Sequence, residues 1–152
     1  MSGETFAGGC QCGAVRFAVD GPLGRASICH CRMCQKATGG LFGPFVGGRN
    51  FRWTRGSPAH FQSSDKVRRG FCAECGTPLS FEFGARVELS IGAFDEPSAI
   101  RPTMQLHVES RMPWFGDLEG LKAIPVSETP LKGDVVSRQH PDHDTELWPP
   151  GR

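Results

Sequence analysis

The chain has 152 residues, of which 38% are hydrophobic and 22% are charged, and its formal net charge is +1 at pH 7. This length and composition predict one folded domain and exclude a disordered chain or a long array of domains. The balanced charge argues against nucleic acid or an anionic membrane as a partner, and no apolar run approaches the roughly 18 residues that span a bilayer.

Short segments in which hydrophobic and polar residues alternate dominate the chain. Twenty glycines and twelve prolines favour many turns and few long helices. A two-residue alternation predicts strands, expected in chain order at 15–19, 42–46, 51–53, 59–62, 79–83, 87–91 and 104–108. Two short helices are expected, near 33–38 and, after Pro113, at 114–121. The sequence therefore predicts a single, mainly β domain.

Both ends of the chain carry few structural signals. The first residues, MSGETFAGGCQCG, lack the basic and apolar stretches of a signal peptide. We therefore expect a cytoplasmic location, where thiols stay reduced. From Ser127 onward the chain is rich in proline, aspartate and histidine without periodicity, which predicts an irregular tail.

Seven cysteines fall into three tight groups, which is the most informative feature of the sequence. In a reducing compartment, clustered cysteines indicate metal or catalytic ligands before disulfides, and an odd number cannot pair completely within one chain. Soft thiolates at one- and two-residue spacing are ligands that suit zinc. The groups are Cys10-x-Cys12, Cys29-x-Cys31-x-x-Cys34 and Cys72-x-x-Cys75.

The first and last groups together predict a closed metal site. In an extended segment Cys10 and Cys12 point the same way. Cys72 and Cys75 resemble a zinc knuckle, and the following Gly76 allows the positive φ of a tight turn. Joined, the two pairs form a four-thiolate site that ties together segments about sixty residues apart, a structural role.

The middle group places three thiolates within six residues. Cys29 and Cys31 face the same way in an extended segment, so His30 is expected beside the ligands or at the surface rather than as a ligand. An ion held by Cys29, Cys31 and Cys34 keeps a fourth position for water or substrate, as catalytic zinc does.

Spacing alone leaves other interpretations of the cysteines open. A distant histidine such as His60, His107 or one in the tail could complete a second structural site. Cys31-x-x-Cys34 could act as a dithiol in redox chemistry or metal buffering. A zinc-stabilised β domain could also be a non-catalytic module that binds nucleic acid or protein. The best local candidates for nucleic acid are Arg49, Arg52, Trp53 and Arg55.

Several strings resemble the glutathione-dependent formaldehyde-activating enzyme (GFA) family, also called the CENP-V/GFA domain. They are GCQCGAVRF at 9–17, CHCRMCQK at 29–36 and FCAECGTPL at 71–79, with weaker blocks IGAFD at 91–95 and SRMPWF at 110–115. The resemblance covers residues 5–125 and leaves 126–152 as the tail. It implies a GFA-like fold of several coiled antiparallel β-sheets stapled by zinc, with little helix.

The resemblance also implies two zinc ions with different roles. The structural ion is held by Cys10, Cys12, Cys72 and Cys75. The catalytic ion is held by Cys29, Cys31 and Cys34 with one position open, which favours the catalytic interpretation of the middle group.

The activity implied is that of a carbon–sulfur lyase resembling S-(hydroxymethyl)glutathione synthase, which joins a thiol such as glutathione to an aldehyde such as formaldehyde. Three thiolates weaken the Lewis acidity of zinc, so delivery of an ionised substrate thiol is favoured over polarisation of the aldehyde. Lys66, Arg68 and Arg69 form a basic run typical of a solvated strand edge. Near an open zinc, Arg68 and Arg69 are candidates for binding the carboxylates of glutathione.

Overall fold

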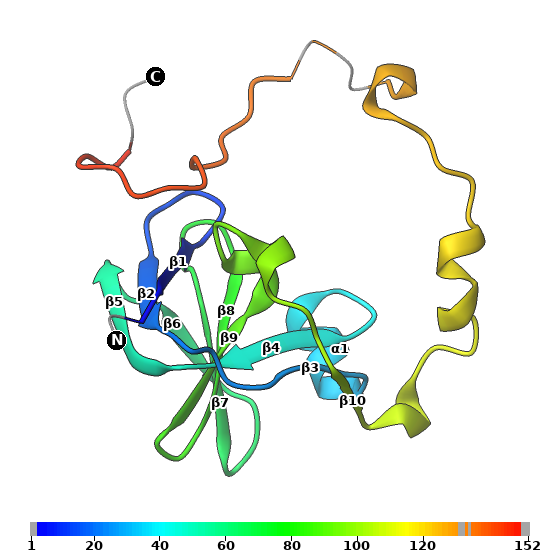
Figure 1. The fold of residues 1–152 in the computed structure, drawn as a ribbon, viewed down its shortest axis with the longest axis horizontal. Helices are drawn as coiled ribbons and strands as arrows, with labels where there is room; N and C mark the ends of the chain where they lie inside the picture. The colour runs from blue at the N-terminus through cyan, green and yellow to red at the C-terminus, as the bar shows by residue number, and fades with distance from the viewer. Residues whose placement is uncertain (1–2, 131–132, 134, 150–152) are drawn as a thin grey trace.

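The computed structural model describes residues 3–130, 133 and 135–149, and its strands form two sheets (Figure 1). The smaller sheet has the order β1 (Thr5–Gly9), β2 (Arg16–Asp20), β5 (Arg49–Arg55), and its neighbours are antiparallel. The larger sheet has the order β10 (Met104–Leu106), β3 (Ala26–Cys29), β4 (Gly43–Gly47), β9 (Arg86–Ser90), β8 (Pro78–Phe83), β7 (Val67–Phe71), β6 (Ala59–Gln62). In it β10 runs parallel to β3 and the other pairs are antiparallel. The mainly β single domain is confirmed.

Helix is scarce, as expected. Helix α1 (Arg32–Thr38) starts where the Cys31 sulfur accepts the Cys34 amide at 3.3 Å, and it ends at Gly39, whose φ of 69° closes the last turn. The helix expected at 114–121 is a 3-10 helix, Phe115–Gly120. The remaining 3-10 turns in the described ranges are Ile91–Ala93, Pro97–Ala99, Val108–Ser110 and Val126–Glu128.

Three strands escaped the sequence analysis: β1, β3 and β7. β1 ends in two glycines, and β3 has only four residues, so neither displays a clear alternation. β7 contains Arg68 and Arg69 of the basic run that was interpreted as a solvated strand edge. Arg68 is half exposed, but the edge position is wrong, because β7 pairs with β6 on one side and β8 on the other. An internal strand sends Arg68 and Arg69 to opposite faces of the sheet.

The main core lies between the two sheets. Phe17 of β2 is fully buried and meets the ring of Phe94 edge to face, with centroids 5.0 Å apart. Val19 of the same strand packs with Val46 of β4 and Leu89 of β9. This packing explains the alternation in β2, since every second residue must enter the core.

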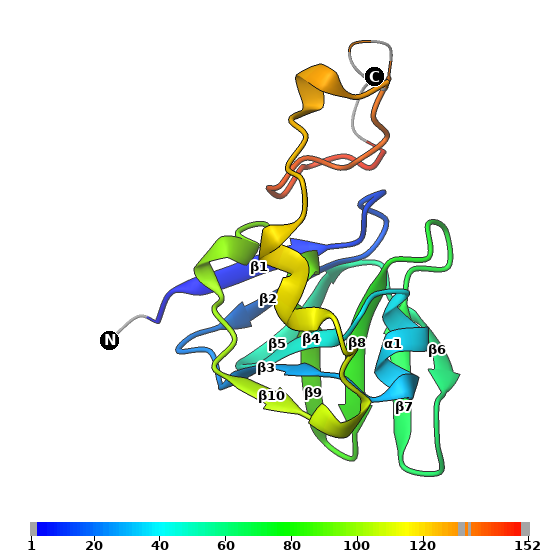
Figure 2. The same ribbon diagram turned by 90° about the vertical axis from the view of Figure 1, so that its right-hand side faces the viewer.

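The opposite face of the larger sheet carries a second, smaller apolar cluster. Phe45 of β4 and Phe81 of β8 lie here, packed with Cys29 and Cys34. Helix α1 packs against β4, beside β8 in the view of Figure 2. The middle cysteine group thus stands on the face of the sheet that the small sheet does not cover.

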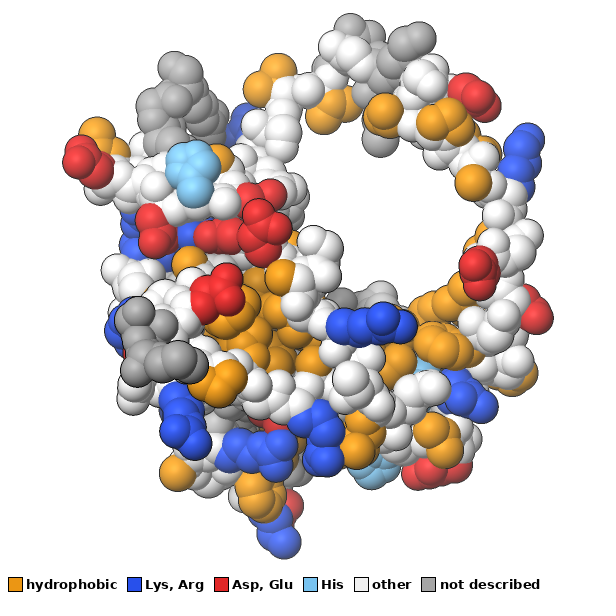
Figure 3. All heavy atoms as spheres, in the orientation of Figure 1, with side chains coloured by type: hydrophobic (Ala, Val, Ile, Leu, Met, Phe, Trp, Pro, Cys, Tyr) orange, Lys and Arg blue, Asp and Glu red, His pale blue; other side chains and the backbone are white. Residues whose placement is uncertain are grey.

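The chain leaves the body after β10 and returns to it at the tail (Figure 1). Leu121, Ile124 and Val126 are exposed along this arc, which stands clear of the body in Figure 3. The tail then docks on the loop after β1: the His140 amide donates to the Gln11 carbonyl at 2.7 Å. The described residues of the tail contain no strand, yet His140 and Trp148 are bound to the loop after β1 by hydrogen bonds.

An ion pair anchors the tail to the core. Arg16 of β2 is 2% exposed, and its two terminal nitrogens donate to the two carboxylate oxygens of Asp95 at 2.7 and 2.6 Å. Its Nε donates to Asp144 of the tail at 2.9 Å. Sequence analysis offered no role for Asp95, because its partner lies 79 residues away.

Replacing Asp95 with asparagine is expected to lower the free energy of unfolding by about 3 kcal/mol, because a buried guanidinium loses its bidentate partner. Asp144→Asn is the matched control: that side chain is 62% exposed, so the expected loss is under about 1 kcal/mol. Urea unfolding of both variants with excess zinc measures the difference. Equal effects of the two substitutions would contradict this account of Arg16.

Candidate metal centres and substrate pocket

The first and last cysteine groups meet in space. Cys10 and Cys12 lie in the loop after β1, and Cys72 and Cys75 lie in the turn between β7 and β8. All four sulfur atoms are within 4.8 Å of one another. The Cys10–Cys12 distance is 3.6 Å and the Cys12–Cys72 distance is 3.9 Å. Sulfurs around a tetrahedral zinc stand about 3.8 Å apart, given Zn–S bonds of about 2.3 Å. The group therefore fits a zinc ion.

Two glycines allow the turns of this centre. Gly76 follows Cys75 with a φ of 80°, and its amide donates to the Cys72 carbonyl at 2.8 Å, as the zinc-knuckle interpretation expected. Gly13 has a φ of 81°, and a Cβ there would lie 2.1 Å from the ring of His140. The tail therefore packs directly on the Cys10–Cys12 loop.

Tail residues cover the same loop without joining the metal site. The indole Nε1 of Trp148 donates to the Cys12 carbonyl at 2.7 Å. His140 is buried, and its Nδ1 lies 2.7 Å from the Pro141 carbonyl oxygen. Within the described residues, the metal-binding group here consists of the four cysteines alone.

The middle group also converges. Cys29 is the last residue of β3, Cys31 caps α1 and Cys34 lies in its first turn. Their three sulfurs are within 4.8 Å of one another, so this group could hold a second metal ion. The three thiols converge because β3 ends at Cys29 and the capped helix α1 begins directly after Cys31.

No histidine joins the three sulfurs in the described part of the chain. The Nε2 of His30 lies 2.9 Å from the Gln105 side-chain oxygen, and its ring packs against Phe42 and Phe115. His60 lies 2.9 Å from Glu82, and His140 belongs to the tail and binds the loop that carries Cys10 and Cys12. The arrangement therefore leaves three protein ligands and room for a fourth from outside.

The surroundings shift the pKa values of the three thiols in different directions. Burial raises the pKa of Cys29 to about 12 and also raises that of Cys34. Burial acts on Cys31 too, but the Cys34 amide, the neighbouring thiols and the charge of Arg69 outweigh it and lower its pKa. Because thiolates bind metal, an ion must displace protons from Cys29 and Cys34, so its affinity falls as the pH falls.

A cavity of about 380 Å³ opens beside these three cysteines. Its floor is the face of the larger sheet that carries Phe45 and Phe81, and the cavity crosses that sheet from β7 to β10. A volume of this size suits a small organic molecule. The apolar side chains that line it are Met33, Phe45, Val67, Phe81, Phe83, Met104 and Leu106.

The two arginines expected near the open site have different surroundings. Arg69 lines the cavity, and its Nη2 lies 3.5 Å from the Cys34 sulfur. Arg68 lies on the opposite face, where its Nε donates to Glu82 at 2.6 Å. Of the pair expected to bind carboxylates, only Arg69 is at the pocket.

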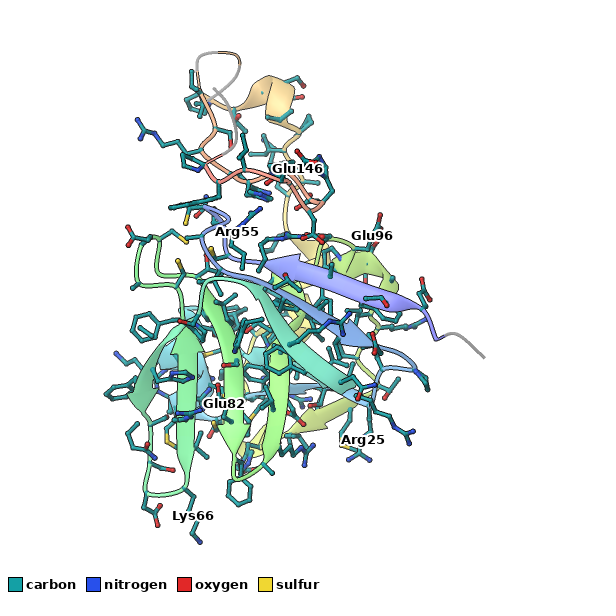
Figure 4. All side chains as sticks on the ribbon, turned by 90° about the vertical axis from the view of Figure 1, so that its left-hand side faces the viewer. Arg25, Arg55, Lys66, Glu82, Glu96 and Glu146 are labelled. Atoms are coloured by element: carbon teal, nitrogen blue, oxygen red, sulfur yellow. The ribbon has the colours of Figure 1, made fainter. Side chains whose placement is uncertain are left out.

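Glu82 forms a buried polar cluster that sequence analysis missed. Its carboxylate lies 2.9 Å from both the His60 ring and the Ser80 hydroxyl, and it accepts from Arg68 (Figure 4). Burial opposes ionisation, but these partners outweigh it and lower the pKa of Glu82. No local signal could have revealed the cluster, because β6, β7 and β8 meet only through sheet pairing.

Three of the four candidate residues for nucleic acid on β5 have partners within the chain. Arg52 pairs with Asp20 at 3.2 Å, and Arg55 donates to the backbone of Thr145. The Trp53 ring packs edge to face on Phe51, with centroids 4.7 Å apart. These contacts engage Arg52, Trp53 and Arg55 within the chain, whereas Arg49 is exposed.

A bilayer-spanning helix is not among the described elements, since none combines the length and apolar character that crossing requires.

The sequence profile of the family described as glutathione-dependent formaldehyde-activating enzyme matches residues 5–110, more than half of the chain. The matched range contains all seven cysteines and the ten strands of the described residues. The resemblance in the cysteine strings is thereby confirmed, and the chain belongs to the glutathione-dependent formaldehyde-activating enzyme family.

Proposed function

We propose that the protein is a zinc-dependent carbon–sulfur lyase that makes and breaks the S-hydroxymethyl adduct of a glutathione-like thiol and an aldehyde such as formaldehyde. The observation that carries this proposal is the convergence of three cysteine sulfurs beside a 380 Å³ cavity. The family match supports the same chemistry.

The two cysteine groups take separate roles in this proposal. Cys10, Cys12, Cys72 and Cys75 hold a structural ion. Cys29, Cys31 and Cys34 hold the catalytic ion, and they are the residues that we propose for catalysis. When bound there, zinc supplies a fourth coordination position at which a substrate thiol can lose its proton.

The reaction balances without an oxidant. A carbon–sulfur bond forms between the thiol sulfur and the aldehyde carbon, the carbonyl π bond breaks, and the thiol proton ends on the new hydroxyl oxygen. The apolar walls around Phe45 and Phe81 limit the water near the thiol group. Arg69 places a positive charge beside Cys34 and so partly balances the three thiolates.

The remaining proposals concern organisation and location. We place the catalytic domain at 5–125 and a docking tail at 126–152. A reducing compartment, the cytoplasm, suits seven cysteines that form no disulfide in the structure. The alternative of a dithiol redox protein has less support, because all three thiols of the middle group point at one common ligand position.

The direct test is the rate at which formaldehyde exchanges between its free form and S-hydroxymethylglutathione. We expect zinc-loaded protein to accelerate this exchange on the order of a hundredfold over the spontaneous reaction, measured by NMR exchange with labelled formaldehyde. Protein stripped of its metal serves as the control. An exchange rate equal to the spontaneous one, with zinc confirmed in both sites, would contradict the proposal.

A further inference from the structure

The charges that line the cavity are unequal. Arginines line it at three positions, 25, 69 and 86, whereas Glu88 is the one acidic side chain among the described lining residues. Glu88 is already paired with Arg86 on the same strand. Among the described residues, therefore, the guanidinium groups of Arg25 and Arg69 have no acidic partner, and the cavity lining holds no free carboxylate for a ligand's amino group.

Arg69 is the more informative of the two. It is only 7% exposed, its Nε donates to the Ser63 hydroxyl at 3.0 Å, and its guanidinium stacks over the Phe81 ring at 5.2 Å. No carboxylate lies within ion-pairing distance of it in residues 3–130, 133 and 135–149. Burying a cation without an anionic partner costs free energy, because the charge loses its contact with water. A buried arginine of this kind therefore indicates that an anion binds next to it.

The three thiolates supply only part of the negative charge that the buried Arg69 requires. Arg69 reaches the Cys34 sulfur with one nitrogen at 3.5 Å, and a guanidinium carries five N–H donors. Ser63 and Cys34 use two of them. The fork geometry of the remaining donors matches a carboxylate, and the side chain faces the cavity beside the ligand position of a bound thiol.

We propose that Arg69 binds a carboxylate of the substrate thiol, so that the pocket selects thiols that carry a carboxylate and does not recognise an amino group. This inference rests on the proposed function, because it needs the thiol sulfur at the open position beside Cys34. Arg25, labelled in Figure 4, also lines the cavity but precedes β3, and three strands (β4, β9 and β8) lie between β3 and β7.

The test uses three small thiols that differ in charge: 3-mercaptopropionate, 2-mercaptoethanol and cysteamine. Their binding to the zinc-loaded protein is measured by calorimetry and corrected for the ionised fraction of each thiol. We expect 3-mercaptopropionate to bind about tenfold or more tightly than 2-mercaptoethanol, as one charge-assisted hydrogen-bonded pair provides. Cysteamine is expected to bind most weakly, because its ammonium meets arginines.

Two adjacent variants locate the effect. Arg69→Gln is expected to remove the preference for 3-mercaptopropionate, and Arg68→Gln, on the opposite face, is expected to retain it. If Arg69→Gln loses zinc or folds poorly, the thiol series on the unaltered protein decides the question. Equal binding of the three thiols would overturn the carboxylate assignment without contradicting the proposed function. Absence of binding by all three would overturn both the assignment and the proposed function.

Discussion

Replacing Cys31 with serine is expected to remove one of two zinc ions per chain and to reduce turnover by about a thousandfold or more, while the chain stays folded. Loss of one of three ligands opens the ion to water and competing ligands. The several kcal/mol of charge stabilisation that the metal provides then disappear. Elemental zinc analysis and the formaldehyde exchange assay measure the two effects.

The fold is expected to survive this change for a local reason. The Cys31 sulfur caps α1 by accepting the Cys34 amide, and serine is a good residue at that position. Cys31 packs against the small cluster around Phe45, outside the main core. The far-UV circular dichroism spectrum should therefore match that of the unaltered protein. Full turnover with the middle group emptied of zinc would refute the catalytic role of this centre.

Replacing Cys72 with serine is expected to have the opposite pattern, with loss of the folded state. Cys72 is 1% exposed and belongs to the main core, and its partners Cys10 and Cys12 lie about sixty residues away in the sequence. Structural zinc sites contribute on the order of 10 kcal/mol to folding, which is comparable to the whole stability of a domain.

Thermal unfolding followed by circular dichroism, with Cys31→Ser as the control, checks this expectation. The Cys72 variant should lack a cooperative transition or unfold at a much lower temperature, whereas the Cys31 variant should keep one. Two variants with the same thermal stability would mean that the two centres do not divide into structural and catalytic roles.

Sequence patterns predicted the features that depend on neighbours along the chain. Alternation along β2, β8 and β9 indicated strands, because side chains of one strand must enter one core. The positive-φ glycine after Cys75 is local as well. The grouping of cysteines indicated the two clusters that could hold metal, since thiols one to three residues apart can share an ion in several backbone conformations.

The adjacent residues Arg68 and Arg69 mark where local reasoning stops. Both are arginines in one basic run, and their order in the chain does not say which faces the substrate. Only the pairing of β7 with β6 and β8 makes it an internal strand, with Arg69 beside Cys34 and Arg68 on Glu82.

By itself, then, the sequence of this protein determined its mainly β character, the cysteine groups that could hold metal ions, and its family. The tertiary structure alone decided that Arg69 rather than Arg68 lines the cavity. It also decided that Asp95 pairs with Arg16 and that the irregular tail docks over the Cys10–Cys12 loop. The physical reason is the range of the interactions. Ligand spacing and strand alternation act over a few residues, whereas these contacts join segments that are brought together only when the two sheets pack.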